Sequence, residues 1–128
     1  MKKILIEISA GELIDKMTIL EIKLEKINNP SSRKEIQKEF DILKKSALDL
    51  KKDEDLGKQY EKLKSVNSKL WDIENKKRLC EKENNFKEEF VKLSRDIHFL
   101  NDERAKIKLY INESVGSNIK EIKEYTKY

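Results

Sequence analysis

The chain has 128 residues, enough for one domain with a modest core. Charged residues make up 42% of it and hydrophobic residues 37%, with only one proline and three glycines. This composition is typical of long solvated helices and excludes a sandwich or a doubly wound sheet. The 29 basic and 25 acidic residues give a net charge of +4. Because the two signs are interleaved, we expect no nucleic-acid partner.

The cysteine count and the hydropathy indicate in which cellular compartment the protein is found. Cys80 is the only cysteine, so no disulfide can form within the chain, which fits a reducing environment. No stretch approaches the roughly 20 apolar residues of a membrane span. The first residues are basic and then apolar, but this apolar run is too short for a signal peptide and contains Glu7. We therefore expect a cytoplasmic protein without a membrane partner.

Residues 3–8 alternate in polarity, which predicts a short N-terminal β-strand. Ile4, Ile6 and Ile8 share one face of this strand. A lone strand cannot satisfy its own backbone groups, and the rest of the chain offers no second strand. We therefore expect two copies of the segment to pair, so that the protein is a homodimer.

Periodic apolar residues over the rest of the chain predict an all-α fold, an antiparallel bundle of about four helices after the short strand. Ser9 and Glu12 form a capping box at the start of the first helix. That helix is apolar on several sides, so we expect it to lie centrally. The helices are expected at 10–28, 33–52, 56–83 and 86–114, followed by a tail at 117–128, all within one domain, 1–128.

Caps and jumps in the phase of the apolar stripe give the other helix boundaries. Ser32 and Glu35 form a second capping box. The stripe changes phase at the acidic residues 53–55 and again at Asn84–Asn85, so we expect a break at each place. Gly116 is typical of a C-terminal cap. The tail beyond it is expected to be a weak helix that docks or frays.

Arg104 interrupts the apolar stripe of the last helix, as Asn67 and Glu74 interrupt that of the preceding one. An unpaired charge in a helical core is very costly, so we expect Arg104 to be buried and bonded to a carboxylate. Glu74 is one candidate, but counting from the turn between the helices leaves it roughly 13 Å away along the axis. The other candidates are an acid on the first helix, Asp15 or Glu21, or an acid across a dimer.

Glu12 and Asp15 are three residues apart, so both carboxylates can face one way on a helix. A magnesium site would need a second pair facing the first, and Asp72 and Glu74, two apart, do not share a helical face. Lys16 beside the pair would compete with a cation. We therefore expect no metal and no cofactor, with Glu12 acting as a cap and Asp15 in a surface salt bridge.

Glu74, Arg78 and Glu81 are four and three residues apart, so they form a ladder along one helix face. This ladder is either a row of salt bridges or an arginine presented to a phosphate or carboxylate. Trp71 on the same helix fits a core or interface position, or a stacking platform.

Asn101, Lys108 and Asn112 share one face of the last helix, with the small Ala105 between them. A small residue there would let another helix or a ligand approach. No Ser-His-Asp arrangement, glycine-rich phosphate loop or Cys/His metal spacing is present in the sequence, so no catalytic residue is assigned.

Two classes of function stay open. The first is a binding or assembly module, a helical homodimer with a polar site between helices that engages a protein or a small anionic ligand. The alternative is an enzyme acting on a phosphorylated or carboxylated metabolite. In that enzyme Arg78, Arg104 and Lys108 would hold the anion, with Glu74 or Asp102 as the acid or base.

Three strings run through the chain: ISAGELIDKMTILEIK at 8–23, LWDIE at 70–74, and NDERAKIK at 101–108 followed by Ile111–Asn112. Together they resemble a bacterial and phage family catalogued as domain of unknown function 6165, over nearly the whole chain. The family brings no established activity. Its occurrence near surface-polysaccharide genes implies sugar or nucleotide-sugar metabolism. The resemblance emphasises polar residues as the candidate ligand-binding set: Glu12, Asp15, Lys16, Glu74, Arg78, Asn101, Asp102, Arg104, Lys108 and Asn112.

Overall fold

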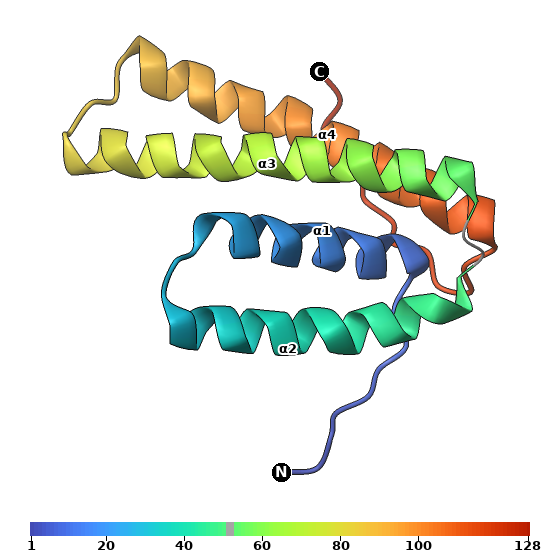
Figure 1. The fold of residues 1–128 in the computed structure, drawn as a ribbon. Helices are drawn as coiled ribbons and strands as arrows, with labels where there is room; N and C mark the ends of the chain where they lie inside the picture. Colours follow the sequence, from blue (N-terminus) through green and yellow to red (C-terminus); the bar gives the residue numbers. More distant parts are fainter. Residues whose placement is uncertain (51–52) are drawn as a thin grey trace.

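The computed structural model describes residues 1–50 and 53–128, and the predicted all-α class is confirmed. Consecutive helices run in opposite directions and form two hairpins that pack on each other (Figure 1). No helix among the described residues has the length and apolar character to cross a membrane. The elements are α1 (Ala10–Lys26), α2 (Pro30–Ser46), the 3-10 helix η1 (Ala47–Asp49), α3 (Glu54–Lys82) and α4 (Glu88–Val115).

Helix α1 is central, as its several apolar sides predict, and it packs against α2, α3 and α4. Leu13 and Ile14 of α1 are buried in the same core cluster as Leu56 and Leu63 of α3 and Ile111 of α4. Burying large aliphatic side chains on three neighbours stabilises the bundle by roughly 1.5–3 kcal/mol for each side chain.

Caps account for three observed helix boundaries, two of them close to the predicted ones and that of α3 two residues earlier than predicted. Ser9 Oγ accepts a hydrogen bond of 3.1 Å from the backbone N–H of Glu12 and begins α1. Asp53 Oδ1 accepts one of 2.8 Å from the backbone N–H of Leu56 and begins α3. Gly116 ends α4 with a φ of +69°, a left-handed conformation that glycine adopts without strain.

The second helix departs from the prediction. It begins at Pro30 because the side chain of Asn29 accepts a hydrogen bond of 2.9 Å from the backbone N–H of Ser32. Proline suits the first turn, since its missing N–H would be unpaired there in any case. Ser32 and Glu35 therefore lie inside the helix. The α-helix ends at Ser46, and residues 51–52 of the predicted helix lie outside the described residues.

The N-terminal β-strand prediction is wrong for the described structure. Residues 3–8 form no strand, and Ile4 and Ile6 are 79% and 76% exposed. The segment leads away from the helices (Figure 1). Alternating polarity favours a strand only where a second strand completes the backbone hydrogen bonds, and the described residues offer none. The tail at 117–128 likewise forms no helix.

The α3–α4 hairpin extends past the end of the α1–α2 hairpin (Figure 1). Helix α1 ends at Lys26, whereas α3 continues to Lys82. The middle of α3 therefore passes from a stretch that α1 covers to a stretch that α1 leaves open, which positions the site described next.

Candidate functional site

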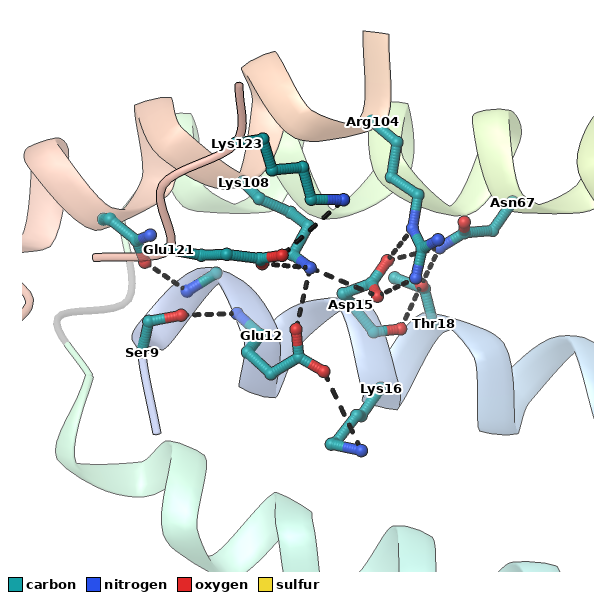
Figure 2. Close-up of polar contacts among 12 residues, drawn as sticks. Ser9, Glu12, Asp15, Lys16, Thr18, Asn67, Arg104, Lys108, Glu121 and Lys123 are labelled. Carbon is teal, nitrogen blue, oxygen red and sulfur yellow. Dashed lines mark hydrogen bonds and ion pairs between the residues drawn. The ribbon is translucent and has the colours of Figure 1, made fainter. Parts of the chain in front are cut away.

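A buried carboxylate joins the three central helices. Asp15 of α1 is 1% exposed, and its Oδ1 accepts hydrogen bonds from Asn67 Nδ2 of α3 at 2.8 Å and from Arg104 Nε of α4 at 2.9 Å. A second nitrogen of Arg104 donates to Oδ2 of the same carboxylate (Figure 2). Thr18 donates to the backbone carbonyl of Asp15 at 2.7 Å and accepts from Asn67 at 2.9 Å. No fully buried side-chain nitrogen or oxygen among the described residues lacks a hydrogen-bond partner.

The pairing confirms that Arg104 is bonded to a carboxylate, and it selects Asp15 among the candidates. The Arg104 side chain is only 26% exposed. Glu21 instead accepts a hydrogen bond from the Tyr60 hydroxyl. The expected surface salt bridge of Asp15 is wrong, because the three helices close over this carboxylate.

Lys108 extends the network toward the start of α1 (Figure 2). Its Nζ lies 2.7 Å from Glu12 Oε2, 3.8 Å from Asp15 Oδ2 and 3.0 Å from Glu121 Oε2 of the tail. Glu12 and Asp15 thus do face one way, and the cation between them is an ammonium group. Within residues 1–50 and 53–128, no cluster of three His, Cys, Asp or Glu side chains suits a metal ion.

The pKa values at the network keep its groups charged. Burial raises the pKa of Asp15, but hydrogen bonds from Arg104 and Asn67 and the nearby positive charges outweigh it, so the pKa lies below its usual value. Burial lowers the pKa of Lys108, and hydrogen bonds to Glu12 and Glu121 reverse the shift, so the pKa lies above its usual value.

A close backbone approach fixes the start of α1 on α4. The backbone N–H of Gly11 donates to Asn112 Oδ1 at 2.6 Å, and that of Ala10 donates to Ser117 Oγ at 3.1 Å. These bonds satisfy N–H groups that the first turn of a helix leaves unpaired. A Cβ atom at position 11 would lie 2.5 Å from the backbone oxygen of Lys108. The close approach expected near Ala105 therefore occurs at the glycine, and Asn112 serves as its partner.

A pocket of about 490 Å³ opens beside the network, between α1, α3 and α4. Its apolar lining comes from Ile19 and Ile22 of α1 and from Leu70 and the half-buried Trp71 of α3. The polar lining comes from α3 and α4: Asn67, Glu74, Asn75, Arg78, Asn101 and Arg104.

Four of these polar side chains differ from those of the network in their hydrogen bonding. Within the described residues, no side-chain hydrogen bond or ion pair joins Glu74, Asn75, Arg78 or Asn101 to the rest of the protein. Of the two interpretations of the Glu74, Arg78 and Glu81 ladder, the row of salt bridges is therefore not formed among the described residues. The pocket presents acceptors, amides and a guanidinium to whatever enters it.

The ten candidate residues thus fall into separate groups. The network contains Glu12, Asp15, Arg104 and Lys108, while Asn112 binds the start of α1. The pocket contains Glu74, Arg78 and Asn101, and shares Arg104 with the network. The two others lie elsewhere: Lys16 makes an exposed ion pair of 3.8 Å with Glu12, and Asp102 accepts from the Tyr128 hydroxyl.

Sequence reasoning left several participants out of the candidate set. Asn67 had a signal, because it interrupts the apolar stripe of its helix. Trp71 had a signal as a possible stacking platform, and Asn75 directly follows the candidate Glu74. Thr18 and Glu121 had no signal, since one lies beside the apolar face of α1 and the other is in the tail, whose course over α4 does not follow from helical periodicity.

Comparison with known proteins gives one match. The model of a family described as a family of unknown function (DUF6165) matches residues 3–128, so the chain belongs to that family and the predicted resemblance is confirmed. No curated protein and no solved structure matches the chain.

Proposed function

We propose that this member of the DUF6165 family is a helical binding module that acts as a homodimer and holds a small anionic ligand in the pocket between α1, α3 and α4. One observation carries the proposal: polar side chains that have no hydrogen bond or ion pair within the described residues line a pocket next to the hydrogen-bonded Asp15 network. Side chains that serve only folding find partners within the fold, so the pocket groups are suited to a ligand.

Two guanidinium groups favour an anion. An arginine has five N–H donors, and Asp15 engages only two nitrogens of Arg104. Both arginines line the pocket, and Arg78 has no hydrogen bond or ion pair within the described residues. The Asp15 pair also fixes Arg104 before a ligand arrives, which reduces the entropy lost on binding. Guanidinium groups match carboxylate and phosphate oxygens in geometry.

A thermal-shift screen with phosphate, dicarboxylates, sugar phosphates and nucleotides, each with and without magnesium, tests the proposal. Some of these anions should raise the melting temperature of the wild type, because a ligand that binds only the folded state stabilises it. The shift should disappear in Arg78→Gln and persist in Arg95→Gln, which removes an exposed arginine of α4 outside this pocket. Stabilisation by none of the anions, or an equal shift in both variants, would contradict the proposal.

The homodimer rests on the exposed N-terminal segment. Ile4, Leu5 and Ile6 are 79%, 87% and 76% exposed, and two copies of this segment can satisfy their backbone groups by pairing. Light scattering should give twice the monomer mass of 15.2 kDa, and deletion of residues 2–7 should give the monomer. A wild-type monomer at high concentration would contradict this part of the proposal.

Glu74 favours the enzyme alternative, in which a bound phosphorylated or carboxylated metabolite reacts. Its carboxylate lines the pocket that Arg78 and Arg104 also line, so it can serve as an acid or base beside a held anion. Asp102, the other candidate, is bonded to Tyr128 instead. A compound that binds in the screen should then be turned over by the wild type and bound without turnover by Glu74→Gln.

A further inference from the structure

We propose that the pocket takes a mononucleotide, with the base at Trp71 and the phosphate at Arg78. The inference rests on the proposed anion-binding function and names its ligand class. It follows from the order in which charged, aromatic and amide groups succeed one another along the pocket.

The Asp15 network closes one end of the pocket, and this end attracts an anion less strongly than the Arg78 end. Asn67 and Arg104 bind the same carboxylate oxygen, so they mark one level of the bundle. At this level the charge of Arg104 is offset by Asp15, and that of Lys108 by Glu12 and Glu121. This end therefore has no excess positive charge, and a phosphate would gain less here than beside Arg78, which makes no ion pair within the described residues.

The next level offers a flat aromatic surface with a hydrogen-bonding edge. Because α3 and α4 run in opposite directions, moving three residues from the shared level brings Leu70 of α3 level with Asn101 of α4. Trp71 is adjacent, and Ile19 and Ile22 of α1 complete the apolar wall. An indole beside aliphatic side chains suits a stacked planar ring, and an amide both donates to and accepts from ring edges. Inorganic phosphate or a small dicarboxylate would leave this wall uncovered.

Arg78 stands at the open end of the pocket. It lies two turns beyond Trp71 on the same face of α3, about 10 Å along the axis. Its side chain is exposed and makes no ion pair within the described residues. Helical side chains lean toward the N-terminus of the helix, so the guanidinium leans back toward Trp71. A phosphate here keeps contact with water while gaining a bidentate cation.

Glu74 and Asn75 lie between the ring level and Arg78. A carboxylate accepts hydrogen bonds from hydroxyl groups, and an amide can donate or accept. These groups suit the ribose that joins a base to its phosphate. The sequence of an apolar wall, neutral or accepting polar groups and a guanidinium thus matches base, ribose and phosphate in that order.

Calorimetric titration of the full chain with AMP, GMP, CMP and UMP tests this proposal, with adenosine and ribose 5-phosphate as ligands that each lack one part. At least one nucleotide should bind tenfold or more tightly than both partial ligands. Trp71→Ala should weaken nucleotide binding tenfold and leave that of ribose 5-phosphate unchanged. Arg78→Gln should reduce the nucleotide to the affinity of the nucleoside, while Arg95→Gln retains wild-type values.

The outcomes separate the two proposals. If ribose 5-phosphate binds as tightly as every nucleotide, the base site is refuted while anion binding at the pocket stands. If adenosine alone binds as tightly as AMP, the assignment of the phosphate to Arg78 is refuted. If no nucleotide binds but a dicarboxylate does, the ligand class is wrong. If no anion of any class binds, the proposed function fails as well.

Discussion

The Asp15 network and the neighbouring pocket contain the same types of polar residue, but only the network residues are paired with one another. In the network, each acid meets a cation or an amide within the protein, and Asp15 is 1% exposed. In the pocket, an acid, an arginine and two amides line a cavity of about 490 Å³ without such partners in the described residues. Asn67 lies where α1 packs against α3, whereas the α3–α4 hairpin extends past the end of α1 (Figure 1). Pairing, more than residue type, distinguishes a structural group from a binding group.

The largest expected effect comes from breaking the network. Arg104→Ala leaves the buried Asp15 carboxylate without its main partner and should lower the free energy of unfolding by about 3–5 kcal/mol. Urea denaturation monitored by circular dichroism measures this change. Near-wild-type stability combined with loss of ligand binding would instead place Arg104 with the pocket residues.

Alanine substitutions of Gly11 and Gly57 should change the stability of the fold in opposite directions. Gly11→Ala places a Cβ 2.5 Å from the backbone oxygen of Lys108 and should destabilise the fold by about 1–3 kcal/mol. Gly57→Ala meets nothing within 4 Å and lies in α3, so it should stabilise the fold by roughly 0.5–1 kcal/mol. Thermal melts of the two variants give the comparison. Equal melting temperatures would contradict the close approach of α1 to α4.

Acid should weaken the Asp15 network. The pKa of folded Asp15 lies below its unfolded value of about 3.9, so its contribution to stability is complete above that pH and is lost as the pH falls through the folded pKa. Chemical denaturation between pH 5 and 2, with Asp15→Asn as reference, isolates this contribution. The variant, although less stable at neutral pH, should lose less stability on acidification, and an equal loss would contradict the assignment.

The smallest effect on stability is expected in the pocket. Arg78→Gln removes an exposed side chain without an ion pair in the described part of the chain, so the free energy of unfolding should change by less than about 0.5 kcal/mol. The same denaturation experiment measures it. A loss of 2 kcal/mol or more would show that Arg78 supports the fold, and the contrast between the two regions would disappear.

The sequence predicted the bundle and the anomaly of Arg104 because both depend on helical periodicity. A charge within an apolar stripe needs a partner, and the axial mismatch with Glu74 already pointed to an acid such as Asp15. Periodicity does not show where a neighbouring helix ends, so it could not separate the covered Asn67 from the open Glu74. It also gave no position for Glu121, and it suggested a strand at 3–8 that lacks a pairing partner.

Trp71 allows the central claim to be measured directly, because it is the only tryptophan and lines the pocket. Its fluorescence should change saturably when at least one of AMP, GMP, CMP and UMP is added to the wild type and to Arg95→Gln. In Arg78→Gln the same change should require at least tenfold more nucleotide, while the unfolding curve stays that of the wild type. A fluorescence that none of the nucleotides or simpler anions alters, or that responds equally in Arg78→Gln, would contradict the claim that this pocket is a binding site.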